Sequence, residues 1–240
     1  MLMLAIETAT EVVGGALVSD DGPVASFQLS RGRRHAETLA PGIEFLLHQA
    51  AVTVDDLTAI AVDVGPGLFT GMRVGLATAK AMAHALELPI VPVTSLEALA
   101  AAVARDSPER AGRIVAVLDA RRGEVFWASF RVGDDGHLVA HTAPSAATPA
   151  DLLAELLLAD EPLLIVGDGG ERHRSLLAEG LRAATFADVR FALPDVTVVA
   201  DLAVSALTRG EVTDAIGLQP MYLRAPDAAI NWRVRDGGGR

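Results

Sequence analysis

A glycine-rich turn at residues 63–73 joins an apolar strand to a long helix, and its residue types could bind phosphate. Backbone N–H groups at a helix N-terminus attract anions, and glycine lets an anion approach them closely. A Walker A loop needs Lys directly after its last glycine, but Met72 follows Gly71 here. A dinucleotide-binding loop needs its third glycine one residue earlier. The turn therefore either packs its helix closely or contacts an anion. The candidates for an anion contact are Gly65, Gly67, Thr70 and Arg73.

Other strand ends carry further candidate groups. ATPases of the actin-like class place Asp-x-Gly-Thr at the end of their first strand, and Glu7 and Ala9 occupy the Asp and Gly positions here. Because the Cβ of Ala9 would crowd a phosphate, we interpret this segment as a strand end with hydrogen-bonding threonines. Gly-Asp-Gly-Gly at 167–170 is interpreted as a turn. Asp63 and Asp119, both at strand ends, are the remaining candidates for a metal-binding carboxylate pair.

The sequence offers few histidine or cysteine residues that could form a metal site or a catalytic group. The chain has no cysteine, which excludes disulfides, thiolate metal sites and a cysteine nucleophile. Of six histidines, only His137 and His141 have the spacing of a helical metal-binding pair. They fall in an expected strand, where that spacing separates them by about 13 Å, so we interpret both as surface residues. No metal site and no catalytic triad are predicted.

The elements that position these groups follow from apolar runs, turn residues and capping sequences. Three strands joined by tight turns predict an antiparallel meander, and the prolines around 88–93 predict an edge strand. The order strand, strand, strand, helix, strand, helix occurs twice. Expected strands are 2–8, 12–19, 24–29, 58–64, 88–93, 113–118, 124–131, 137–141 and 163–167. Expected helices are 35–50, 70–86, 171–180 and 197–209, with others opening at Thr94 and Thr148.

This repeated order predicts an α/β protein with an actin-like fold, built from two tandem α/β half-domains with mixed sheets. We place the halves at 1–106 and 107–240, with a disordered C-terminal tail. The net charge of −11 argues against strong binding of tRNA or DNA by this chain alone. Without a signal sequence or an apolar run long enough to span a bilayer, the expected location is the cytoplasm, away from membranes.

Six segments resemble the TsaB family, and together they cover most of the chain. The most specific is Gly-Pro-Gly-x-Phe-Thr-Gly-x-Arg-x-Gly, at residues 65–75. The segments are AIETAT at 5–10, RRHAETLAPGIEFLL at 33–47, DVGPGLFTGMRVGLATAKAMA at 63–83, VPVTSLEALA at 91–100, DARRGEVFWASF at 119–130 and PMYLR at 220–224.

The resemblance implies a noncatalytic subunit of the complex that transfers a threonylcarbamoyl group to the tRNA adenosine beside the anticodon. The implied partners are a TsaD-like catalytic paralogue and a TsaE-like ATPase, and tRNA is met only through the complex. The paralogue binds its metal through a helical His-x-x-x-His, and the matching positions here are Ser95 and Leu99. Neither side chain suits that site, since serine is a poor ligand and leucine is none.

By the same resemblance, helices 35–50 and 70–86 would form the face that meets the partner, and the same face could make a homodimer. No tightly bound cofactor is expected, with ATP or ADP placed only at the subunit boundary. We expect Leu76→Glu to abolish pairing if Leu76 faces outward. The alternatives are an independent actin-like ATPase or kinase, and a peptidase. Candidate interface residues are His35, Leu39, Ile43, Leu46, Arg73, Leu76, Thr78 and Lys80.

Overall fold

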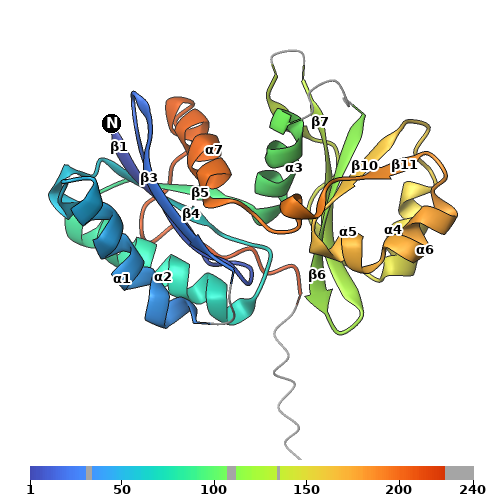
Figure 1. Ribbon diagram of the computed structural model, residues 1–240, viewed down its shortest axis with the longest axis horizontal. Coiled ribbons are helices and arrows are strands. Elements are labelled where there is room, and N and C mark those ends of the chain that lie inside the picture. The colour runs from blue at the N-terminus through green and yellow to red at the C-terminus, as the bar shows by residue number, and fades with distance from the viewer. Residues whose placement is uncertain (31–33, 107–111, 134–135, 225–240) are drawn as a thin grey trace, which may run out of the picture.

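The computed structural model describes residues 1–30, 34–106, 112–133 and 136–224, and it consists of two α/β halves that lie side by side (Figure 1). The segment 225–240, which contains the expected disordered tail, lies outside the described residues. Two of the four residues of the turn expected at 133–136 lie outside them as well. Among the described residues, no helix combines the length and apolar character needed to cross a membrane.

The first half contains a five-stranded mixed sheet in the order β3-β2-β1-β4-β5. The antiparallel meander is confirmed for β1 to β3, and β4 and β5 add to β1 in parallel. The edge position of β5 is also confirmed. The strands are β1 (Leu2–Glu7), β2 (Val13–Ser19), β3 (Gly22–Leu29), β4 (Ala59–Asp63) and β5 (Ile90–Val93).

Two helices cover one face of this sheet. They are α1 (His35–Gln49) and α2 (Phe69–Leu86), and their apolar stripes share one core with β1 and β4. Helix α1 runs through Pro41, and Gly42 leaves room for the ring of Phe27 from β3. A short 3-10 helix, η1 (Val54–Asp56), follows α1.

The second half contains a six-stranded sheet in the order β11-β10-β6-β7-β8, with β9 also paired to β7. Strands β9 and β11 were not predicted, since each has only three residues. The strands are β6 (Arg113–Arg121), β7 (Glu124–Val132), β8 (Leu138–Ala140), β9 (Ser145–Ala147), β10 (Leu163–Val166) and β11 (Ala184–Phe186). The helical segments are α4 (Pro149–Leu156), α5 (Asp168–Arg172), α6 (Arg174–Gly180) and η3 (Val189–Phe191).

Both halves repeat one topology, an antiparallel meander extended by two parallel strands, and this duplicated arrangement is the expected actin-like fold. The last helix of each half packs across the boundary. Helix α3 (Ser95–Asp106) follows β5 but packs its apolar side on the second sheet. Helix α7 (Val196–Thr208) returns to the first sheet and covers the face opposite α1 and α2. The boundary expected at 106/107 therefore separates the sheets, but not the helices that cover them.

Candidate functional site

The ends of β1 and β4 bring two carboxyl groups together. Parallel pairing aligns Ile6 with Val62, so Glu7 and Asp63 lie next to each other although 56 positions separate them. Both side chains are fully buried. Glu7 Oε1 accepts hydrogen bonds from the backbone N–H and the hydroxyl of Thr10, each at 3.2 Å. Asp63 Oδ1 accepts from the N–H of Gly65 at 2.7 Å and from the Ser95 hydroxyl at 2.8 Å.

The second oxygens of this pair, Glu7 Oε2 and Asp63 Oδ2, have no hydrogen-bond partner among the described residues. The two carboxyl groups lie against each other, so a proton on one of them relieves their mutual repulsion. Burial, followed by repulsion from Asp63, raises the pKa of Glu7 well above its ordinary value. Burial raises the pKa of Asp63 as well, but Glu7 is the member of the pair that binds a proton more readily. The sequence predicted the threonine contacts of Glu7 but not its pairing with Asp63.

The glycine-rich turn packs on the loop after β1. A Cβ at Gly67 would overlap the carbonyl of Ala9, and one at Gly71 would overlap the carbonyl of Thr8. The Ala9 carbonyl also accepts the N–H of Leu68, at 2.6 Å. Backbone of the β1–β2 loop thus occupies the space in which a phosphate cradle would hold its anion. The close-packing interpretation is confirmed for Gly67 and Gly71.

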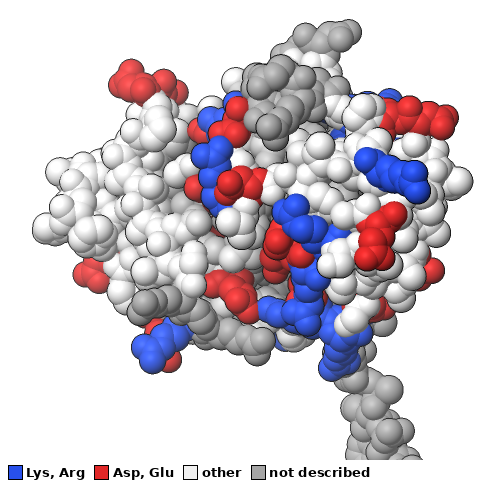
Figure 2. Space-filling view, turned by 45° about the vertical axis from the view of Figure 1, so that its right-hand side comes forward, with Lys and Arg blue, Asp and Glu red and all other residues white. Residues whose placement is uncertain are grey.

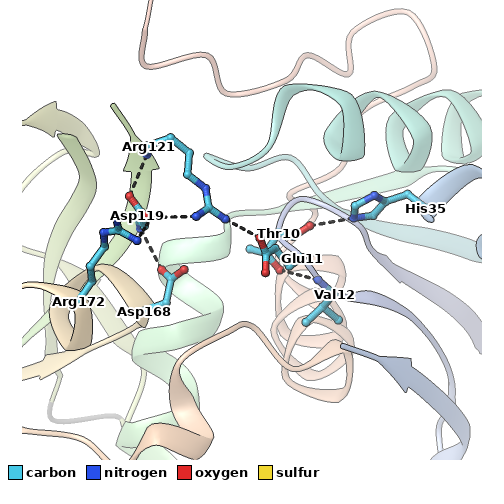
Figure 3. Close-up of polar contacts among 8 residues, drawn as sticks. All are labelled: Thr10, Glu11, Val12, His35, Asp119, Arg121, Asp168 and Arg172. Carbon is cyan, nitrogen blue, oxygen red and sulfur yellow. Dashed lines mark hydrogen bonds and ion pairs between the residues drawn. The ribbon is translucent and has the colours of Figure 1, made fainter. Parts of the chain in front are cut away.

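A polar network joins the two halves across the junction (Figure 3). Arg121, at the end of β6, forms ion pairs with Glu11 of the first half at 2.5 Å and with Asp119 at 3.1 Å. Arg172 of α5 also approaches Asp119, at 3.5 Å. Asp168 accepts the N–H of Asp119, at 2.9 Å. Asp119 thus pairs with arginines whereas Asp63 pairs with Glu7, so the two do not form the carboxylate pair considered from the sequence.

The Gly-Asp-Gly-Gly segment is not the simple turn that was expected. Gly167 is the N-cap of α5, with a positive φ of 104°, and the helix begins at Asp168. A Cβ at Gly167 would overlap the carbonyl of Val117, and Gly169 lies as closely against Leu118. These glycines bring α5 against β6.

A cluster of aromatic and guanidinium groups lies at the N-terminus of α2. Phe69 and Tyr222 are 46% and 42% exposed, with ring centroids 5.4 Å apart. The Cζ atom of Arg73 lies 3.8 Å from the centroid of the Phe69 ring, and its Nε donates to the Tyr222 hydroxyl at 3.1 Å. We call Phe69, Arg73 and Tyr222 the aromatic–arginine cluster. Tyr222 was missed as a site residue, although PMYLR was part of the resemblance.

The structure corrects most of the candidate interface. Leu76 is only 5% exposed and packs in the core of the first half, so the expectation that it faces outward is wrong. His35 is buried too, and its Nε2 donates to the Thr10 carbonyl at 2.8 Å. The same burial removes three aliphatic residues from any partner surface, namely Leu39, Ile43 and Leu46. Arg73 is exposed, and Thr78 and Lys80 are half-buried.

Beyond the aromatic–arginine cluster, the outer faces of α1 and α2 carry small residues and the aromatic Phe45, beside exposed acidic residues such as Glu37 and Glu44. Phe45 is 56% exposed. In Figure 2, charged side chains gather along the junction of the halves, and the first half at the left shows few. We call the exposed small residues and Phe45 the α1–α2 surface. It comprises Ala36, Ala40, Pro41 and Phe45 of α1 and Ala77, Ala81 and Ala85 of α2.

The positions matching the paralogue's metal ligands have other roles here. Ser95 is buried and donates to Asp63, and Leu99 is fully buried in the core of the second half. Their side chains do not fit a metal site. Within the described ranges, no group of three His, Cys, Asp or Glu side chains is placed to hold an ion. His137 and His141 are both exposed, as expected.

Comparison with known proteins agrees with this architecture. Residues 29–232 match the family model of TsaD, tRNA N6-adenosine threonylcarbamoyltransferase. The tRNA threonylcarbamoyladenosine biosynthesis protein TsaB of Bacillus subtilis is 31% identical over 232 residues, which cover 97% of this chain and 98% of that protein. TsaB of Escherichia coli is 29% identical over 224 residues, which cover 93% of this chain and 95% of that protein. The solved structure of YeaZ from Pseudomonas aeruginosa superposes on this protein with a TM-score of 0.78. The two sequences are 28% identical, and the match covers 92% of this chain and 99% of that one.

These relatives match over nearly the whole length of this chain. The transferase model covers most of the chain as well, which agrees with a common origin of the two proteins. The chain belongs to the TsaB family of tRNA threonylcarbamoyladenosine biosynthesis proteins.

Proposed function

We propose that this protein is a noncatalytic subunit of the complex that transfers a threonylcarbamoyl group to tRNA. In this proposal it pairs through the α1–α2 surface with a TsaD-like transferase, and the pair works with a TsaE-like ATPase. The tRNA is bound by the complex, in keeping with this chain's net charge of −11. The observation that carries the proposal is the α1–α2 surface, a set of exposed small residues and Phe45 on two adjacent helices.

The chemistry of the strand ends supports a noncatalytic role. Glu7 and Asp63 form a fully buried pair, so a substrate cannot reach either carboxyl group. The β1–β2 loop fills the space at the glycine turn, and Arg121 joins the halves by an ion pair with Glu11. Each of these groups has a structural partner already. None is left exposed with a raised pKa in the way that an acid–base catalyst needs.

The shape of the α1–α2 surface supports pairing by helices. Ala77, Ala81 and Ala85 lie four residues apart and form one exposed ridge along α2. Small side chains let a second helix approach closely, and Phe45 on α1 offers the large aromatic anchor that often dominates binding energy. Because the partner is a paralogue with related helices, a homodimer through the same surface is the competing arrangement.

A single charge placed in this surface tests the proposal. Ala81→Arg would bury an unpaired guanidinium between close-packed helices, and we expect it to weaken binding to the TsaD paralogue by more than 100-fold. Ala154→Arg is the matched control, since Ala154 is an exposed helical alanine of the second half. Affinity is measured by calorimetry, and the oligomeric state of each protein alone by sedimentation. Equal affinity for both variants would refute pairing through this surface.

In this proposal ATP or ADP binds at the boundary with the partner subunit and not inside this chain. Gly65 and Gly67 pack against Met72 and Ala9, whereas Thr70 and Arg73 are exposed. Any ATP or ADP contact would therefore use the exposed pair together with the partner subunit. The isolated chain should accordingly show no ATP turnover, which is the measurement that separates this proposal from an independent ATPase or kinase.

A further inference from the structure

The aromatic–arginine cluster is assembled from two segments far apart in the sequence. Phe69 and Arg73 lie on the first turns of α2, and Tyr222 comes from the segment that follows α7. That segment is fixed on both sides of Tyr222. The N–H of Met221 donates to the carbonyl of Val64 at 2.8 Å, and Arg224 donates to the carbonyl of Ala120 at 3.1 Å. Tyr222 is therefore held in place and not free to move away from Arg73.

The Arg73 guanidinium is orientated but not neutralised. One of its faces lies on the Phe69 ring, and its Nε is occupied by the Tyr222 hydroxyl. Within the described residues no carboxylate forms an ion pair with it. Among the described residues, several other exposed arginines are paired with carboxylates, for example Arg105 with Asp201, although Arg182 is not. Arg73 thus presents its two terminal nitrogens with no acidic partner, although the chain carries a net charge of −11.

The cluster also continues the proposed pairing surface. Phe69, Arg73, Ala77 and Ala81 are spaced four residues apart, and all four are exposed. A helix packed along the alanine ridge would therefore reach the cluster at one end. Aromatic residues and arginine are the side chains that contribute most per residue to protein interfaces.

We propose that the aromatic–arginine cluster binds a carboxylate side chain of the TsaD-like partner and thereby selects that partner. The proposal rests on the proposed function, since it assumes pairing along α2. Guanidinium binds carboxylate through two parallel hydrogen bonds, and the two terminal nitrogens of Arg73 are left for this purpose. Because Phe69 and Tyr222 already hold the side chain, little conformational entropy is lost when the carboxylate binds.

Calorimetry of the full-length chain with its TsaD paralogue, at low and high salt and without nucleotide, tests the proposal. We expect Arg73→Ala to weaken binding about 10- to 100-fold and to reduce the salt dependence of the affinity. Arg73→Lys should recover only part of the loss, since an ammonium group does not form the planar fork. Tyr222→Phe, which removes only the hydroxyl, should cause a smaller loss. Arg182→Ala is the control, because Arg182 is exposed and carries no described contact.

The partner's carboxylate can be identified by exchanging the charges of Arg73 and of each candidate acidic residue of the partner. Arg73→Glu should abolish binding, and replacing the matching acidic residue of the partner by Arg should restore it. Binding by Arg73→Ala within twofold of the unmodified protein would overturn the inference. If Ala81→Arg still abolishes pairing in that case, the proposed function survives; if neither variant matters, the proposed function fails as well. A dependence on Arg73 that appears only after ADP is added would also overturn it, because the guanidinium would then bind phosphate.

Discussion

Replacing Glu7 by Gln tests the protonated carboxyl pair most sharply. The amide has nearly the same shape as the protonated acid, so its oxygen can accept from Thr10 as Glu7 does and its NH2 group can donate to the adjacent Asp63. The variant should therefore fold normally. What it removes is the proton that Glu7 must bind on folding whenever the pH is above its ordinary pKa.

The sign and size of the effect follow from linkage. The pKa of Glu7 is raised in the fold, so between its unfolded and folded pKa values the folded protein binds more protons than the unfolded chain. The free energy of unfolding then falls by about 1.4 kcal/mol for each pH unit in that interval. The stabilising contribution is complete below the unfolded pKa and is lost as the pH rises through the folded one. Glu7→Gln does not show this loss, so its free energy of unfolding increases relative to that of the unmodified protein as the pH rises.

The assay is urea unfolding followed by circular dichroism, from pH 5 to pH 9, for both proteins. The difference between their unfolding free energies should increase with pH at the stated slope until the pH reaches the folded-state pKa of Glu7, and level off above it. Glu44→Gln is the control, because Glu44 is exposed on α1, and its difference from the unmodified protein should stay constant. Parallel curves for Glu7→Gln would refute the reasoning, since they would mean that Glu7 binds no extra proton on folding.

Three further substitutions test the packing and the junction. Leu76→Ala should lower the free energy of unfolding by about 2–5 kcal/mol, measured in urea, because Leu76 is a core residue; a loss of pairing without a loss of stability would restore the outward-facing interpretation. Gly67→Ala should cost roughly 3 kcal/mol, because its Cβ would meet the Ala9 carbonyl, and an unchanged midpoint would contradict the close packing. Arg121→Ala should cost less than about 1 kcal/mol, because its pair with Glu11 is partly exposed, yet limited proteolysis at the junction should accelerate; unchanged cleavage rates would argue against its joining role.

Local sequence signals predicted the elements well. The helix predicted to open at Thr94 does so through reciprocal hydrogen bonds between Thr94 and Glu97. Such signals succeed because they depend on contacts three residues apart. The edge position of β5 followed in the same way, from prolines that cannot donate a ladder hydrogen bond.

The errors have a common physical cause. Both faces of α2 are small or apolar, so periodicity alone could not decide which of them meets the sheet, and Leu76 was assigned to the wrong side. The pairing of Glu7 with Asp63 depends on β1 and β4 being neighbours. One available signal was that both acids end apolar strands, since parallel neighbours bring such ends together.

The return of α7 to the first sheet and the contact of Tyr222 with α2 could not be read from local patterns. Each joins segments more than a hundred residues apart, which only the packing of the complete chain brings together.

The most direct test of the central claim is reconstitution of the tRNA modification. The TsaD paralogue, the TsaE-like ATPase, tRNA, ATP and the threonylcarbamoyl donor are combined with this protein, without it, and with Ala81→Arg in its place, and modified adenosine is quantified. The account predicts product only with the unmodified protein or with Ala154→Arg, and none from this protein alone. Equal product without this protein, or with Ala81→Arg, would contradict it.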